Sequence, residues 1–201
     1  ERLAAGAQIG VDFHCVDVSK TDTYDNCTCK NCRVYMKKYN NALSAPMMEF
    51  VNIIARDVKE QAPGLRVTTL AYAGLEKPCT GFVAEDNVNV SFCFYIPDNA
   101  HHLSGDNGPE SCRNKYLADY FIGWTEIAPV DVWYYTGDWM YDIAAAPIVT
   151  NIYYDIKFLS QYNTRGVFFM GGNTDYTAGN QLADYMVNKM LWNSDISYEE
   201  F

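Results

Sequence analysis

The feature that most constrains the fold of this chain is a regular alternation between short apolar segments and longer segments with helical spacing. The predicted strands are Gly10–Val18, Arg66–Ala73, Val88–Ile96, Val130–Thr136 and Gly166–Met170, and the predicted helices are Pro46–Gln61, Glu110–Ile127, Thr150–Tyr162 and Leu182–Leu191. Ser44 is the predicted N-cap of the first of these helices. Strands that are joined through crossover helices pair in parallel. The alternation therefore predicts an α/β fold with five parallel strands.

Two architectures satisfy this alternation, an open doubly wound sheet and a (β/α) barrel of the TIM type. Neither a Gly-x-Gly-x-x-Gly turn nor a Gly-x-x-x-x-Gly-Lys turn follows the first predicted strand, so the nucleotide-binding open sheet lacks its signature. We therefore expect a TIM-type barrel. We expect residues 1–201 to form a single α/β barrel-type domain, the C-terminal portion of a barrel in a longer protein.

Composition limits the classes of partner. The 25 acidic residues outnumber the 15 Lys and Arg residues and give a net charge of -10, which opposes a phosphate backbone, so we expect no nucleic-acid partner. No run of about 18 apolar residues occurs, so we expect no membrane span. Aromatic residues make up 15% of the chain, and aromatic rings suit the flat apolar faces of sugars as well as protein cores.

Reactive groups of a parallel barrel lie at the carboxyl ends of its strands. Glycoside hydrolysis needs a proton donor and a second group that stabilises or attacks the developing cation. Three carboxylates follow predicted strands and are predicted as catalytic: Asp22, Glu76 and Asp138. The predicted substrate-binding residues are Tyr72, Trp133, Tyr134, Tyr135, Asn173 and Asp175. The alternatives are that the carboxylates are helix caps or turn formers and that the aromatic residues pack in the core.

Cys27, Cys29 and Cys32 form a Cys-x-Cys-x-x-Cys cluster. Close thiolates bind zinc tetrahedrally, so the cluster predicts a structural zinc site with Cys15 or a histidine as the fourth ligand. Disulfides are the alternative in an exported protein, and free thiols are a third reading. Catalysis itself requires no cofactor in this interpretation. We interpret the His101-His102 pair as part of a surface loop, with metal or substrate binding as the alternative.

Several ordered segments together resemble a known family. They are Val18-Ser19-Lys20-Thr21-Asp22, the cysteine cluster, Phe50-Val51-Asn52, Leu70-Ala71-Tyr72 before Pro78, Trp124 and Val132-Trp133-Tyr134-Tyr135. Over residues 9–196 the chain resembles the domain of unknown function 4838, members of which are placed in glycoside hydrolase family 163.

The resemblance implies a barrel enzyme of bacterial carbohydrate breakdown, with relatives that act as endo-β-N-acetylglucosaminidases on N-glycans. It implies hydrolysis of O-glycosyl bonds in β-linked glycans that contain N-acetylglucosamine, and hence a glycan or glycoprotein substrate. It also implies a periplasmic, cell-surface or secreted location.

One departure from related chemistry keeps a second class of function open. Substrate-assisted hexosaminidases use an adjacent Asp-Glu pair, whereas here Glu85-Asp86 precedes a predicted strand and no such pair follows one. The alternative is a non-catalytic carbohydrate-binding or scaffold domain with a structural metal held by the cysteines.

Overall fold

The structure is a computed structural model that describes residues 15–135, 149–170 and 178–201. The chain divides into two compact units. The first comprises Glu1–Ser91 with Ile127–Pro129, and the second comprises Phe92–Glu126 with Val130–Phe201. Each unit is described separately below.

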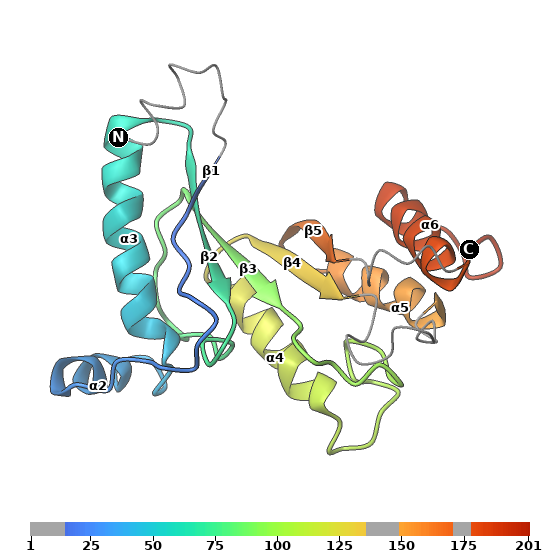
Figure 1. The fold of residues 1–201 in the computed structure, drawn as a ribbon, viewed down its shortest axis with the longest axis horizontal. Coiled ribbons are helices and arrows are strands. Elements are labelled where there is room, and N and C mark those ends of the chain that lie inside the picture. The colour runs from blue at the N-terminus through green and yellow to red at the C-terminus, as the bar shows by residue number, and fades with distance from the viewer. Residues whose placement is uncertain (1–14, 136–148, 171–177) are drawn as a thin grey trace. The chain divides into compact units, whose positions relative to one another are not determined.

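Strands and helices alternate along the described chain (Figure 1). The elements are β1 (Cys15–Asp17), α2 (Lys30–Met36), α3 (Ser44–Gln61), β2 (Arg66–Ala71), β3 (Val88–Cys93), α4 (Arg113–Thr125), β4 (Val130–Tyr135), α5 (Val149–Ser160), β5 (Thr164–Met170) and α6 (Ala178–Trp192). The strands follow the order β1-β2-β3-β4-β5, and β1–β2 and β4–β5 pair in parallel. The predicted α/β fold is confirmed. Among the described strands β1 and β5 do not pair, so the described sheet is open and a closed barrel is not confirmed.

In the first unit, α3 packs against β2 through an apolar stripe. Met48, Val51, Ala55 and Val58 recur every three or four residues and are buried, which is the pattern of a helix with one core face. Ser44 was predicted as the N-cap of this helix, and that prediction is wrong. Ser44 is the first helical residue, and its hydroxyl donates a 2.6 Å hydrogen bond to the carbonyl of Lys77.

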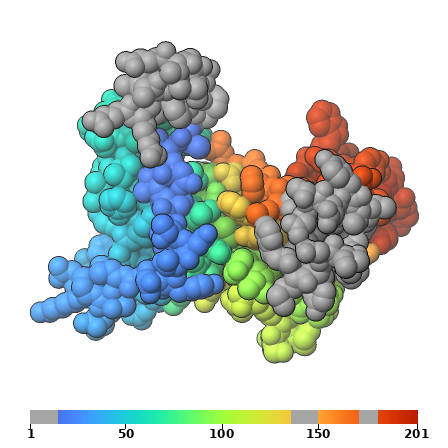
Figure 2. Space-filling model, in the orientation of Figure 1, coloured from blue at the N-terminus to red at the C-terminus, as the bar shows by residue number. Residues whose placement is uncertain are grey.

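The sequence pattern did not predict the short helix α2. Met36 is its one buried residue, so α2 lacks the apolar stripe by which the longer helices are recognised. The segment between β1 and α2 is coloured blue in Figure 2, and most residues from Thr21 to Lys30 are exposed.

An aromatic cluster forms the core of the second unit. The ring of Phe121 lies 5.9 Å from Phe92, 5.6 Å from Phe94 and 5.7 Å from Phe158, measured between centroids. Phe121 lies on α4 and Phe158 on α5, so the cluster joins both helices to the carboxyl end of β3. Offset and edge-to-face pairs of this kind contribute about 0.5–1.5 kcal/mol each beyond burial.

The pairing of β4 with β5 contains one irregularity. Val130 pairs with Thr164 but Asp131 pairs with Gly166, so Arg165 is an additional residue in β5. From there the register is regular up to Tyr135 and Met170. It places the rings of Tyr134 and Phe169 in a stacked arrangement with centroids 6.3 Å apart.

No helix of the described residues has both the length and the apolar character needed to cross a bilayer.

Candidate functional site

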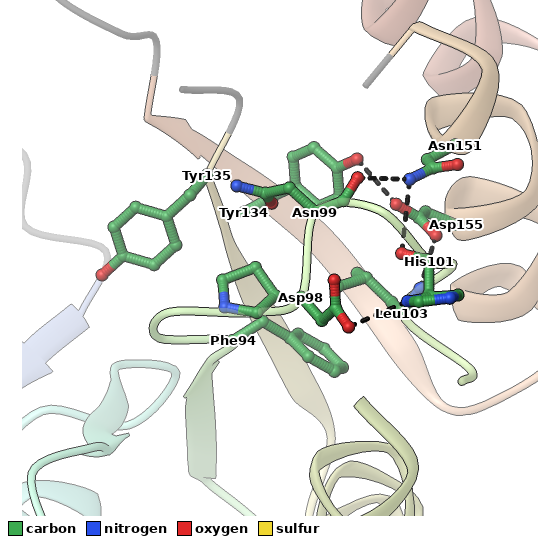
Figure 3. Close-up of a pocket in the computed structure, with 10 residues that line it drawn as sticks. Phe94, Asp98, Asn99, His101, Leu103, Tyr134, Tyr135, Asn151 and Asp155 are labelled. Carbon is green, nitrogen blue, oxygen red and sulfur yellow. Dashed lines mark hydrogen bonds and ion pairs between the residues drawn. The ribbon is translucent and has the colours of Figure 1, made fainter. Parts of the chain in front are cut away.

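A pocket lies in the second unit, where the carboxyl ends of β3 and β4 meet the loop after β3 and the helix α5 (Figure 3). It is a shallow pocket that is partly open to solvent. The residues that line it are Phe94, Pro97, Asp98, Asn99, His101, Leu103, Tyr134, Tyr135, Asn151 and Asp155. Ligand sites of α/β proteins commonly lie at this edge, because the loops that follow parallel strands converge there.

The buried carboxyl group of Asp155 is held by two hydrogen bonds. Its Oδ2 accepts a 2.8 Å bond from the hydroxyl of Tyr134, and its Oδ1 accepts a 2.7 Å bond from the backbone N–H of Leu103. Burial raises the pKa of Asp155 to about 7, although both hydrogen bonds act in the opposite direction. Burial therefore favours the protonated form of this carboxyl group.

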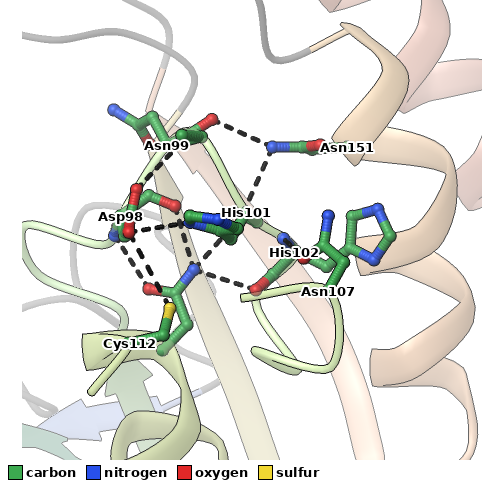
Figure 4. A network of polar contacts seen from close by, with 9 residues as sticks. Asp98, Asn99, His101, His102, Asn107, Cys112 and Asn151 are labelled. Carbon is green, nitrogen blue, oxygen red and sulfur yellow. Dashed lines mark hydrogen bonds and ion pairs between the residues drawn. The ribbon is translucent and has the colours of Figure 1, made fainter. Parts of the chain in front are cut away.

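The second carboxyl group of the pocket belongs to Asp98, and its pKa is shifted the other way. Its Oδ2 lies 2.8 Å from Nδ1 of His101, and this hydrogen bond lowers the pKa of Asp98 below its usual range. The thiol of Cys112 lies 3.8 Å from the same oxygen (Figure 4). The pocket thus contains one carboxyl group that favours the ionised form and one that favours the protonated form.

Two buried amide side chains fix the loop that carries Asp98 and His101. Asn114 donates from Nδ2 to the carbonyls of Asp98, His101 and His102, at 3.0, 3.2 and 2.8 Å. Its Oδ1 accepts from the backbone N–H of Asp98 at 2.8 Å. Asn151 on α5 donates to the carbonyl of His101 at 3.3 Å, which ties the loop to that helix. These bonds position the loop against both α4 and α5 (Figure 4).

Only some of the predicted site residues of the second unit line the pocket. Tyr134 and Tyr135, at the end of β4, both line the pocket. Trp133 does not line it, and its Nε1 instead donates to the sulfur of Met170 at 3.2 Å. Three predicted residues lie outside the described residues: Asp138, Asn173 and Asp175.

The predicted site residues of the first unit follow β1 and β2. Asp22 is exposed, and Glu76 is half-buried with its Oε2 accepting from the backbone N–H of Gly74 at 2.9 Å. Tyr72 directly follows β2 and is half-buried.

The ammonium group of Lys20 joins the two segments that carry Asp22 and Glu76. Its Nζ donates to Oδ1 of Asn26 at 3.2 Å and to the carbonyl of Ala73 at 2.9 Å. The segments after β1 and β2 are thereby brought together at the carboxyl ends of these strands.

The cysteine cluster is also in the first unit. The sulfur atoms of Cys27, Cys29 and Cys32 all lie within 4.8 Å of one another, and none of the three is in a disulfide. The backbone N–H of Cys32 donates to the sulfur of Cys29 at 3.5 Å and is the main cause that lowers the pKa of Cys29 to about 7. A second group with metal-binding atoms within 4.8 Å consists of Asp98, His101 and Cys112.

Sequence reasoning missed several residues of the pocket. His101 was assigned to a surface loop, whereas it is half-buried and lines the pocket. Asn151 and Asp155 lie in a predicted helix, one turn apart, beside the buried Ile152 and Ile156. Polar residues at four-residue spacing on an otherwise buried helix face were the signal that could have identified them.

No curated protein and no solved structure matches the chain. A family model described as a domain of unknown function (DUF4838) matches residues 8–201. The match extends over nearly the whole chain and confirms the family resemblance inferred from the ordered sequence segments. The chain therefore belongs to the DUF4838 family of domains of unknown function.

Proposed function

We propose that the chain is part of a glycoside hydrolase that acts on β-linked glycans containing N-acetylglucosamine, and that the pocket of the second unit takes a sugar. The reaction is hydrolysis of an O-glycosyl bond, with a glycan or glycoprotein as substrate. In this proposal the chain forms the C-terminal portion of a TIM-type barrel, and the protein works in the periplasm, at the cell surface or outside the cell.

The observation that carries the proposal is the pair of carboxyl groups in one pocket with opposite pKa shifts. A glycosidase needs a carboxyl group that holds a proton at working pH and another group that carries or supports negative charge. Asp155, with its pKa raised to about 7, suits the proton donor. Asp98, with its pKa lowered by His101, suits the ionised partner.

The remaining wall of the pocket supports a sugar ligand. Phe94, Tyr134 and Tyr135 are the aromatic residues of the pocket lining (Figure 3). Aromatic faces pack against the C–H faces of sugar rings, while polar side chains bind the hydroxyl groups. Asn99 and Asn151 are the amide side chains in the lining.

The carboxylates at the other strand ends stay predictions. Asp22 and Glu76 are retained as catalytic or substrate-orienting groups because they follow β1 and β2, and Asp138 because it follows β4. The Asp22→Asn variant tests the first of these. Loss of hydrolysis with the fold intact would add Asp22 to the catalytic residues.

The proposal is tested by assaying the protein on an aryl N-acetyl-β-glucosaminide and on a glycoprotein. We expect the Asp155→Asn variant to lose at least about 100-fold in kcat, the usual effect of losing a general acid. The matched control is Asp119→Asn, an exposed aspartate on α4, which should leave kcat unchanged. Full activity in Asp155→Asn would overturn the assignment of the acid.

A second function is favoured by one specific observation. Both oxygens of Asp155 are engaged, by Tyr134 and by the backbone of Leu103, as they would be if the carboxyl group served only to hold the loop. The corresponding function is a non-catalytic carbohydrate-binding or scaffold domain. Binding of chitooligosaccharides by calorimetry without turnover of either substrate would support this function over the hydrolase.

A further inference from the structure

We propose that Cys27, Cys29 and Cys32 form a zinc site that fixes the segment between β1 and α2. The site lies in the first unit and does not depend on the proposed hydrolase activity. Three thiolates bind one zinc ion, and a water molecule completes a tetrahedral coordination sphere.

The sulfur positions fit a zinc ion with little movement. Zn–S bonds of about 2.3 Å in a tetrahedron place the sulfur atoms about 3.8 Å apart. The three sulfur atoms already lie within 4.8 Å of one another, so small side-chain rotations bring them to bonding distance. Cys27 and Cys29 are exposed, which leaves the fourth position open to water.

The local backbone also favours a bound thiolate. Cys29 is the N-cap of α2, and its sulfur accepts the backbone N–H of Cys32. An N–H group directed at a ligand sulfur stabilises its negative charge and orients it, as outer hydrogen bonds do for other metal ligands.

The charge around the cluster is complementary to the loaded site. Three thiolates with one Zn²⁺ carry a net charge of -1. Lys30 is the first residue of α2, Arg33 lies in its last turn, and Lys37 and Lys38 follow its end. This basic segment stands out in a chain with a net charge of -10.

A disulfide accounts for the cluster less well than a metal. A disulfide joins two of three sulfur atoms that lie close together and leaves the third one unpaired. Zinc uses all three, and it requires no oxidant, because each thiol only releases its proton to solvent as the Zn–S bond forms.

The zinc site would complete the anchoring of an exposed segment. Lys20 already holds this segment near its middle, through Asn26 and the carbonyl of Ala73. The metal would fix its far end, because Cys27 belongs to the segment while Cys29 and Cys32 belong to the beginning of α2. Asp22 lies between Lys20 and Asn26 in the sequence.

The test measures metal content and thiolate coordination. The protein is purified with a reductant and without a chelator, and its zinc content is measured by elemental mass spectrometry. Zinc is then removed and the protein is titrated with Co²⁺, whose thiolate charge-transfer and tetrahedral ligand-field bands report the ligands. We expect one zinc ion per chain and tight Co²⁺ uptake with both sets of bands.

Replacing any one of the three cysteines should remove the zinc and give weaker thiolate-to-cobalt bands than wild type. The variants are Cys27→Ser, Cys29→Ser and Cys32→Ser. The matched control is Cys15→Ser, because Cys15 is also exposed but lies outside the cluster. It should keep one zinc ion. Circular dichroism identifies any variant that fails to fold. Titration of the zinc-free wild-type protein with Co²⁺ tests the site without a mutation.

Two results would overturn the proposal. One is a zinc-free wild-type protein that is folded and reduced but takes up no Co²⁺ with thiolate bands. The other is an intact mass of the freshly isolated protein that is lower by two hydrogens, with a disulfide mapped within the cluster by peptide analysis.

Discussion

The hydroxyl of Tyr134 donates a 2.8 Å hydrogen bond to the carboxyl group of Asp155, and each of these residues is only 3% exposed. The bond joins the end of β4 to the middle of α5. A buried pair of this kind is costly to break, because the remaining partner keeps a desolvated polar group with one hydrogen bond fewer.

Removing the Tyr134 hydroxyl should therefore destabilise the protein. We expect Tyr134→Phe to lower the free energy of unfolding by about 1–3 kcal/mol, the cost of a buried acceptor that loses its donor. Tyr154→Phe is the matched control on α5, because Tyr154 is exposed, and it should change stability by less than about 0.5 kcal/mol. Urea unfolding measures both. Equal stabilities of Tyr134→Phe and wild type would contradict the role given to this bond.

Asp155 should make stability depend on pH between about 4 and 7. Its pKa is raised from the ordinary 3.8 to about 7 in the folded protein, so the folded state binds more protons than the unfolded state in this range. Stability therefore falls as pH rises through the range, by up to about 4 kcal/mol from this one group. Unfolding free energies of wild type and Asp155→Asn measured at intervals between these pH values check the prediction. The unfolding free energies of wild type and Asp155→Asn should change with pH at different slopes. Parallel curves would contradict the prediction.

The proposed role of Asp155 as an acid predicts the pH dependence of activity. A general acid works only while it carries its proton, so kcat/KM should decrease as pH rises above the pKa of about 7. Steady-state kinetics over a pH series would give this descending limb. A profile that is flat from pH 6 to 8 would assign proton donation to another group.

Asn114 should be essential for the loop that carries Asp98 and His101. Its fully buried side chain donates to three loop carbonyls, so Asn114→Ala should destabilise the protein by about 3 kcal/mol and loosen the loop. Hydrogen exchange of residues 98–103 should accelerate in this variant. Asn188→Ala, on the exposed surface of α6, is the control and should leave exchange in the loop unchanged.

Phe121 is the centre of the aromatic core of the second unit. Phe121→Ala should cost about 3–5 kcal/mol, because the surrounding rings cannot collapse fully into the space it leaves. Tyr116 lies on the same helix but is exposed, so Tyr116→Ala should cost much less. Thermal unfolding of the two variants gives the comparison, and similar melting temperatures would contradict the assignment of this core.

The alternation of strands and helices could be predicted because burial imposes a period of two on strands and about 3.6 on helices. That signal identified α3 by its apolar stripe and β2 by its apolar run. It could not identify α2, which buries little. It also misplaced Ser44 as a cap, because the carbonyl that its hydroxyl binds belongs to Lys77, far along the chain.

Only the strand side of the pocket was identified from the sequence. Tyr134 and Tyr135 were recognised because strand ends are known positions for site residues. The opposite wall comes from α5, where Asp155 occupies the kind of position that a hydrophobic pattern assigns to the core. Its role depends on Tyr134 and Leu103, and no local pattern in the sequence contains such contacts.

The additional residue Arg165 in β5 has a consequence for the ring pair between β4 and β5. Side chains of a strand alternate between faces, so a one-residue shift along β5 would turn Phe169 away from Tyr134. The bulge confines the extra residue to the beginning of the strand. An insertion between Gly166 and Phe169 would instead shift the residues that follow it and separate this ring pair.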